Sequence, residues 1–383
     1  MSAAFSLGGF VMTHFELFGD AKWVSTDKII SAPLFRTEFS AENVKKAEIT
    51  ICGLGMFELY INGKKVSDDL LVPAFSQYCY RDLSSHYTIR QDVMSYRTYA
   101  LNYDITSYLA DGANALGVML GNGWYHLDDE ECGDPTWTSY GNLKLCYKID
   151  IEYNNGATQS IFSDESLKYA ESEITYNNIY GGERHDYSLA KSGFSSVGYD
   201  DSCWSAAVES TPPECEFMLQ TCPPDRVVRT VNPVKIKDFG ETSIYDCGEG
   251  ITGYAVVSPF ENGEEITVRY ADALKADSSL DFYPSGGDTT KLQQEVFKHT
   301  TAGEQYYPHF CWHAFRYIEL SNNACIEIVN VVHSDCPVTS DFDSDNEVLN
   351  WLYKTYLRTQ LDNMHCGVPS DCPHIERLGY TGD

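Results

Sequence analysis

A succession of short runs in which apolar and polar residues alternate is the feature that most restricts the fold of this chain. Residues 47–52 alternate in this way, which is the pattern of a half-buried β-strand. Residues 57–61 follow, and Asn62-Gly63 then predicts a tight hairpin, because both residues tolerate positive φ. Similar runs continue to about residue 153. Many short strands separated by turns at close intervals indicate a β-sandwich.

A second block of the same pattern begins near residue 227. Residues 254–257 and 266–270 are two of its strands, and a turn at Glu261-Asn262-Gly263 lies between them. Four prolines, at positions 212, 213, 223 and 224, lie before this block, and proline fixes φ and has no amide donor. We therefore place a domain boundary there. The predicted organisation is an N-terminal segment at 1–34, a first sandwich with a connector at 35–210 and a second sandwich at 225–334.

The period of the sequence changes at Ser344. Ser344 and Glu347 form a capping-box pattern, in which the hydroxyl and the carboxylate each meet a free amide of the first helical turn. Apolar residues then recur at helical spacing and predict one helix over about 346–363. These residues are Val348, Leu349, Leu352, Tyr353, Tyr356, Leu357 and Leu361. One helix is too little for an α-domain, so we interpret residues 340–383 as the start of a truncated helical domain.

Three carboxylates, Asp371, Glu376 and Asp383, lie in the closing stretch among glycine, proline, serine and threonine. Loops of this composition hold catalytic groups more often than they form cores. Carboxylates in loops are also ordinarily exposed, and an acidic protein has many of them. The residues alone therefore leave two interpretations open, a catalytic loop and a solvated acidic loop.

The charge of the chain is strongly negative. It has 27 basic and 56 acidic residues and a formal net charge of −29. Such a chain repels phosphate backbones and anionic membranes, so we expect no nucleic-acid partner and a neutral substrate. No stretch approaches the roughly 20 apolar residues of a membrane span. The N-terminus has no basic residue before its short apolar run, which argues against a signal peptide, and we expect a cytoplasmic protein.

The 13 cysteines are scattered without a disulfide framework, so we expect reduced thiols in a reducing compartment. Five residues separate Cys366 from Cys372, which is a poor zinc spacing, and no CxxC pair exists to complete a site. We therefore expect no metal site and no cofactor.

Together, these motifs resemble those of the bacterial α-L-rhamnosidases of glycoside hydrolase family 78, over nearly the whole chain. The segments similar to the N-terminal domain of that family are 58–64, 103–106, 112–115 and 121–125. Those similar to its concanavalin-like domain are 244–253 and 313–317. Residues 371–383 resemble the motif that opens the catalytic barrel. The resemblance implies a mainly β fold, in which two consecutive β-sandwich domains precede the first helix and the active-site loop of a truncated (α/α)6 barrel.

The resemblance also implies roles for the closing motif. Glu376 is the general acid, and Asp371, Asp383 and Tyr380 bind and orient the sugar. Neighbouring carboxylates suit a general acid, because they raise its pKa by disfavouring a further negative charge. Inverting glycosidases need a second carboxylate across the sugar, and in the family this base lies further along the chain than these 383 residues. His374-Ile375 replace the usual Gln-Arg of the family, and Tyr380 replaces the usual Trp.

Two hypotheses follow for the function. The first is the N-terminal portion of an α-L-rhamnosidase, which removes terminal α-L-rhamnose from glycosides or polysaccharides by inversion. Because the base and most of the barrel are missing, we expect little or no hydrolysis by the chain alone. The alternative is a non-catalytic β-sandwich module that binds carbohydrate or scaffolds a partner.

Overall fold

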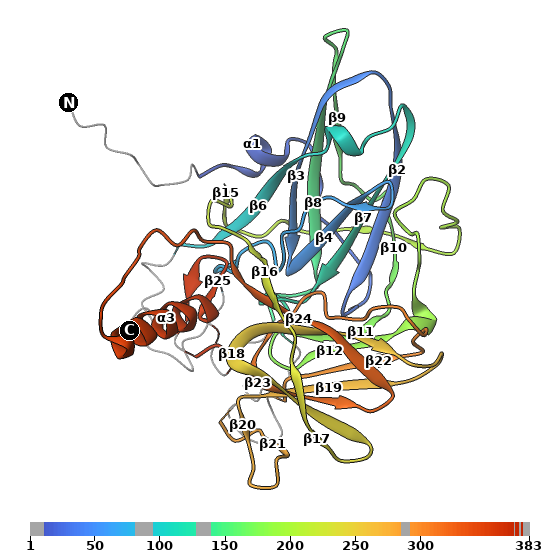
Figure 1. Ribbon diagram of the computed structural model, residues 1–383. Helices are drawn as coiled ribbons and strands as arrows, with labels where there is room; N and C mark the ends of the chain where they lie inside the picture. Colours follow the sequence, from blue (N-terminus) through green and yellow to red (C-terminus); the bar gives the residue numbers. More distant parts are fainter. Residues whose placement is uncertain are drawn as a thin grey trace, which may run out of the picture.

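The computed structural model describes residues 11–80, 95–127, 139–284, 292–370, 372–374 and 377. Within these residues the chain forms two β-domains and one long helix beside them (Figure 1). The mainly β fold class predicted from the sequence is confirmed. Among the helices that the structure describes, none is long and apolar enough to cross a membrane.

The first domain consists of two sheets that share one cluster of buried residues, as expected for a sandwich. The first sheet contains β1 (Val24–Ser25), β3 (Val44–Leu54), β6 (Arg97–Asp104), β8 (Lys144–Tyr153), β9 (Thr158–Phe162), β14 (Val208–Glu209) and β15 (Glu216–Leu219). The second contains β2 (Pro33–Ala41), β4 (Met56–Ile61), β5 (Lys64–Lys65), β7 (Gly112–Gly121), β10 (Lys168–Glu171) and β13 (Ser205–Ala206). A short helix, α1 (His14–Phe18), packs on β8 and β15.

The hairpin predicted at Asn62-Gly63 is present. Strands β4 and β5 pair antiparallel across it, and the two turn residues have φ values of 51° and 78°. Positive φ at both central residues is the conformation that matches the twist of a two-residue hairpin. The local sequence signal therefore identified this turn correctly.

The second domain is built on one continuous sheet. Its strands are β11 (Ile174–Asn178), β12 (Gly182–Asp186), β16 (Asp225–Val231), β17 (Val234–Asp238), β18 (Thr242–Pro259), β19 (Ile266–Ala271), β22 (Gln294–Lys298), β23 (His313–Ser321) and β24 (Ala324–Ser334). A small ribbon of β20 (Ala273–Leu274) and β21 (Leu280–Asp281) lies beside it. The long strand β18 pairs with β17 along its first part and with β24 along its second part. The sheet has a hydrophobic core of its own.

The chain crosses between the domains more than once. Strands β11 and β12 precede the proline-rich stretch, yet β12 pairs in parallel with β22 of the second domain. Strands β13 to β15 then return to the first domain, and β16 re-enters the second. The domain boundary is therefore not a single point in the sequence. Strands from before the proline-rich stretch pair with strands of the second domain, and the chain then returns to the first domain.

The domains meet over a buried apolar cluster that draws on both of them. Phe310 lies so close to Gly121 of β7 that a Cβ atom there would be 2.1 Å from its ring. Beside this contact, the buried Glu58 carboxylate of β4 lies 3.1 Å from Nδ1 of His309. Close packing and an ion pair between the domains make this a fixed junction rather than a loose linker.

The predicted helix is confirmed as α3 (Glu347–Asp362). The predicted capping box is wrong. Asn346 caps the helix, and its side chain accepts hydrogen bonds from the backbone N of Val348 and Leu349. Ser344 instead accepts a hydrogen bond from the backbone N of Asn346, so it lies two residues too early to cap the helix.

Candidate active site

The segment that leads to the closing motif is a small hairpin after α3. Strands β25 (Met364–His365) and β26 (Val368–Pro369) pair antiparallel across Cys366 and Gly367. These two turn residues have φ values of 49° and 73°. Glycine adopts such values without strain, and Cys366 is held in them by the contacts of its backbone N.

Asp225 anchors this hairpin to the second domain. Its side chain is fully buried. Its Oδ1 accepts a hydrogen bond from the backbone N of Cys366 at 2.6 Å, and its Oδ2 lies 2.6 Å from Nδ1 of His365. Ser334 Oγ donates to Asp225 and accepts from the backbone N of Gly367. The ends of β16 and β24 therefore fix the hairpin through buried polar contacts, which are costly to break.

The hairpin also touches the first domain and the junction. The Cys366 thiol points to the backbone O of Leu71, at a distance of 3.5 Å. The His365 ring stacks on the Trp312 ring with centroids 3.7 Å apart and planes inclined by 10°. The hairpin is thus held from both β-domains.

Arg377 is the second anchor, and it lies within the closing motif. Only 6% of the residue is exposed. Its guanidinium donates to the backbone O of Trp312 and to Gln293 Oε1, each at 2.8 Å, and to the backbone O of Ile179. Its carbon Cζ lies 4.1 Å from the centroid of the Trp312 ring. Arginine suits this position because its planar group serves several acceptors and stacks on an aromatic face.

Burial lowers the pKa of Arg377 to about 10, so the side chain stays positively charged at neutral pH. Its charge is compensated by carbonyl oxygens and ring faces rather than by a direct carboxylate partner among the described residues. Breaking these contacts would leave a buried charge without compensation, which is strongly unfavourable. Arg377 is therefore a firmly held residue of the closing motif.

His374 holds the motif at a third point. Its Nδ1 lies 3.3 Å from Oδ2 of Asp272, and its Nε2 lies 3.1 Å from the backbone O of Pro284. Both partners belong to the second domain. Burial raises the pKa of Asp272, whereas the neighbouring His374 lowers it.

The cavity at this point is too small for a sugar. It has a volume of about 40 Å³ and is lined by residues that include Trp124, Trp312, His365 and Arg377. Pockets for small molecules have volumes of roughly 300–1,000 Å³. The described residues therefore hold the motif against the β-domains, but they do not form the complete substrate pocket.

Helix α3 is held on one side and exposed on the other. Arg229 and Arg358 lie 2.7 and 2.6 Å from the Glu249 carboxylate and link the helix to β16 and β18. Burial raises the pKa of the nearby Asp362 to about 7, against the opposing effect of the two arginines. The exposed apolar residues of the helix are Val348, Leu349, Trp351, Leu352 and Tyr356.

All four site residues expected from the resemblance, Asp371, Glu376, Tyr380 and Asp383, lie outside the described residues. Their neighbours Cys372–His374 and Arg377 are described. The sequence analysis did not identify Asp225, Trp312 or Arg377 as part of the site. Arg377 adjoins Glu376 and could have been found from the motif, but Asp225 follows two prolines and has no local signal.

Among the described residues, one group has the side chains to hold a metal ion, namely Glu295, Cys311 and His313. It lies inside the second domain, on β22 and around the start of β23. The cysteines that the structure describes are all free thiols.

Three family models match the chain in succession. Residues 42–229 match the α-L-rhamnosidase N-terminal domain, and residues 237–334 match the bacterial α-L-rhamnosidase concanavalin-like domain. Residues 337–383 match the bacterial α-L-rhamnosidase 6 hairpin glycosidase domain. The order of the three domains is the order expected from the motifs.

Individual relatives agree with these matches. An α-L-rhamnosidase of Formosa agariphila is 31% identical over 92% of this chain and 37% of its own length. The structure of an α-L-rhamnosidase from Dictyoglumus thermophilum is 31% identical, has a TM-score of 0.81 and aligns over 95% of this chain and 41% of its own. A Streptomyces avermitilis α-L-rhamnosidase complexed with L-rhamnose is 25% identical, with a TM-score of 0.80, over 92% of this chain and 33% of its own. The chain therefore spans between a third and about two fifths of the length of these relatives.

Proposed function

We propose that this chain, which belongs to the bacterial α-L-rhamnosidase family, forms the β-domains and the general-acid segment of a glycoside hydrolase that removes terminal α-L-rhamnose. The observation that carries the proposal is the succession of three rhamnosidase domains along the chain. The buried anchors of the closing segment support it. Asp225 holds the hairpin before the carboxylate-rich motif, and Arg377 holds the motif itself. A surface loop without a function does not need such buried contacts.

In this proposal Glu376 gives its proton to the glycosidic oxygen as the bond to rhamnose breaks. Proton donation needs a carboxyl group held to within a fraction of an ångström. Arg377, the next residue, is buried between the carbonyl groups of Ile179 and Trp312. This contact holds the residue that follows the proposed acid in the sequence, and this supports the proposal.

Asp371, Asp383 and Tyr380 bind the hydroxyl groups and one face of the sugar in this proposal. Carboxylates accept hydrogen bonds from sugar hydroxyls, and a tyrosine ring can pack on a sugar face and donate a hydrogen bond. The nearby negative charges also keep Glu376 protonated near neutral pH. One acidic cluster would thus serve both binding and acid catalysis.

The reaction is an inversion in this proposal. A second carboxylate then activates a water on the opposite face of the sugar, roughly 6.5–9.5 Å from the acid. In this proposal the base belongs to the rest of the 6 hairpin glycosidase domain, of which this chain matches a part with residues 337–383. The chain alone should therefore bind rhamnosides weakly and hydrolyse them little.

The partner in this proposal is a neutral, rhamnose-containing glycoside or polysaccharide. The net charge of −29 disfavours anionic partners and is compatible with a neutral sugar. The free thiols of the described residues support a cytoplasmic location, which we also propose.

The test is to join the chain at Asp383 to the helical region that follows the corresponding motif in the Dictyoglumus thermophilum enzyme. We expect hydrolysis of an aryl α-L-rhamnoside by the joined protein and little or none by the chain alone. A folded joined protein without turnover would contradict the enzyme proposal, and rhamnose binding in that case would favour the non-catalytic module. Robust turnover by the chain alone, lost in Glu376→Gln, would show that the base is not where we propose it.

A further inference from the structure

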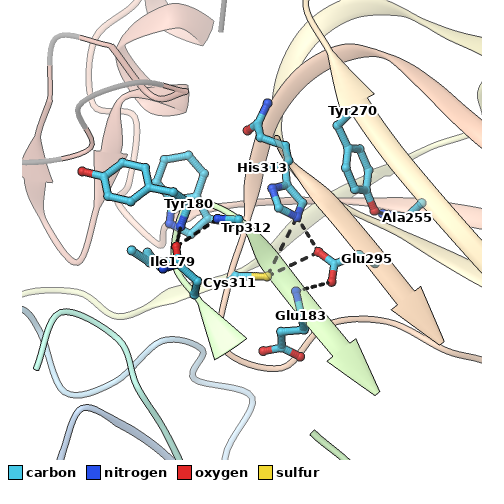
Figure 2. Close-up of polar contacts among 12 residues, drawn as sticks. Ile179, Tyr180, Glu183, Ala255, Tyr270, Glu295, Cys311, Trp312 and His313 are labelled. Atoms are coloured by element: carbon cyan, nitrogen blue, oxygen red, sulfur yellow. Dashed lines mark hydrogen bonds and ion pairs between the residues drawn. The ribbon is translucent and has the colours of Figure 1, made fainter. Parts of the chain in front are cut away.

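A compact group of ionisable side chains is buried in the second domain. Glu295 comes from β22, Cys311 from the loop before β23, and His313 is the first residue of β23. None of the three is more than 2% exposed. Figure 2 shows the Cys311 thiol, the Glu295 carboxylate and the His313 ring pointing toward one another.

The distances within the group are close to those of a tetrahedral zinc site. Cys311 Sγ lies 3.4 Å from Glu295 Oε1 and 3.9 Å from His313 Nε2. Zinc binds sulfur at about 2.3 Å and nitrogen or oxygen at about 2.0–2.2 Å, so ligand atoms at tetrahedral angles are separated by roughly 3.3–3.6 Å. Oε1 of Glu295 and Nε2 of His313, which now share a hydrogen bond, have to move apart, and Cys311 Sγ and His313 Nε2 have to move slightly closer.

The backbone presents two of these ligands on one face. Successive side chains of an extended strand point to opposite sides, so Cys311 and His313 share a side and Trp312 takes the other. The structure agrees: Trp312 contacts Arg377, whereas its two neighbours face Glu295. Figure 2 shows Trp312 beside Ile179 and Tyr180, away from the cluster.

Surrounding residues orient the ligands. Glu295 Oε2 accepts a hydrogen bond from the backbone N of Glu183 at 2.8 Å, which fixes the carboxylate. The His313 ring stacks on the Tyr270 ring, with centroids 4.5 Å apart. Such contacts to the ligands are typical of metal sites, whose affinity depends on them.

The group is not a completely satisfied hydrogen-bond network. His313 Nδ1 is buried and has no hydrogen-bond partner among the described residues. The ring atom that faces Cys311 and Glu295 is Nε2, so a metal ion there would leave Nδ1 unchanged, and Nδ1 does not itself argue for a site. Charge does favour a site, because a thiolate and a carboxylate together balance a divalent cation.

We propose that Glu295, Cys311 and His313 form a binding site for a zinc ion. A thiolate and an imidazole favour zinc over the oxygen-preferring magnesium and calcium ions. The three protein ligands leave the fourth position to a water molecule. Because all three ligands are buried, the role of the ion is structural: it links β22 to the segment just before β23, whose Trp312 holds Arg377. Only Cys366 and Cys372 were considered as metal ligands from the sequence. This group was not predicted, because Glu295 and His313 are 18 positions apart.

The test uses the 383-residue chain, freed of metal by a chelator and titrated with Co²⁺, a coloured substitute for zinc. We expect one equivalent to produce the absorption of a thiolate bound to tetrahedral cobalt, and one equivalent of Zn²⁺ to remove it. Cys311→Ser should abolish the thiolate band. Cys325→Ser is the matched control in the same domain, because its thiol donates to the backbone O of Ser258 and lies outside the group; it should keep the band.

A second readout keeps the test independent of how the Cys311 variant folds. Zn²⁺ should raise the melting temperature of the unaltered chain, because an ion that binds only the folded state stabilises it. Glu295→Gln should lose this increase while keeping the circular dichroism spectrum of a folded β-protein. Absence of the cobalt band in the unaltered chain, or an equal band in Cys311→Ser, would overturn the proposal. Binding by surface carboxylates alone gives no thiolate band and also counts against it.

Discussion

The two β-domains and the segment that follows them are held together by different forces. In the β-domains, core residues such as Ile49 and Phe315 are fully buried. In α3, by contrast, Trp351 is 63% exposed and Leu352 is 54% exposed. The closing segment is fixed mainly by the polar contacts of Asp225 and Arg377. Apolar burial stabilises the domains, whereas a few buried hydrogen bonds decide where the segment lies.

Because of this difference, the stability of the domains and the position of the segment depend on separate sets of contacts. A region with its own core unfolds as a unit, but a segment held by polar anchors can detach without unfolding the rest. Such a segment can be placed accurately, because hydrogen bonds are directional and apolar contacts are not. The exposed apolar side of α3 is suited to packing against further helices, as the proposed barrel requires.

The largest effect should follow from a polar substitution in a domain core. Leu320 in β23 is 1% exposed. We expect Leu320→Gln to lower the free energy of unfolding by about 4 kcal/mol, because it leaves a buried amide without partners and removes apolar packing. Urea unfolding measures this change. A loss below about 1 kcal/mol would mean that the core tolerates polar groups and that the comparison is wrong.

Removing the Arg377 guanidinium should release the segment but not the domains. Arg377→Met removes the hydrogen bonds that the guanidinium donates to two buried carbonyl groups and to Gln293 Oε1, so we expect the anchoring of the segment to weaken by about 3 kcal/mol. Amide exchange should become faster in residues 363–370 and stay unchanged in β3 and β8. The control is Arg358→Met, whose partly exposed ion pair with Glu249 should contribute less than about 1 kcal/mol. Equal loss of protection in the β-strands would contradict a separate segment.

Asp362 gives the helix a pH dependence. Burial raises its pKa to about 7, so the folded state holds the proton more tightly than the unfolded state. At low pH the carboxyl group is neutral in both states and does not change the free energy of unfolding. This free energy falls as the pH rises, until the group is ionised in the folded state above about pH 7. We expect Asp362→Asn to stabilise the docked helix by about 2 kcal/mol at high pH and by almost nothing at low pH.

This prediction is checked by amide exchange of α3 at pH 8 and at pH 4, corrected for the intrinsic exchange rates. Asp345→Asn is the matched control, because Asp345 is exposed just before the same helix. It should change the exchange of α3 little at either pH. A gain from Asp362→Asn that is equal at both pH values would show that the effect does not come from the buried carboxylate.

The smallest effect should come from the same leucine-to-glutamine change on α3. Leu352→Gln removes an exposed side chain, so we expect a change of less than about 0.5 kcal/mol in the free energy of unfolding. Self-association, measured by sedimentation, should decrease because an exposed apolar face is reduced. A large loss of stability would show that this face is already packed in the isolated chain.

Local features of the fold could be predicted from the sequence. The Asn62-Gly63 hairpin and the helix 347–362 follow from contacts between residues near in sequence, and both are confirmed. The helix cap was misplaced because Ser344 and Asn346 are both good capping residues and only the backbone geometry decides between them. The assignment of β12 to the second domain depends on pairing with β22, more than a hundred residues away.

The candidate site could be predicted only in part. The motif itself is visible in the sequence, since its carboxylates are neighbours. The contacts that hold the motif cannot be predicted in this way. Asp225 accepts a hydrogen bond from Cys366, 141 positions away, and Arg377 donates one to Ile179, 198 positions away. Such contacts depend on how the two β-domains pack, which alternation of residues along one strand does not encode.

The most direct test of the account compares two substrates of the joined protein described above. An aryl rhamnoside has a good leaving group and needs little proton donation, whereas an alkyl rhamnoside needs much more. We expect Glu376→Gln to reduce kcat for the alkyl substrate by roughly 10²–10⁴-fold and to affect the aryl substrate far less. Equal losses for both substrates, or none for either, would contradict the role of Glu376 as the general acid of the segment that Arg377 holds in place.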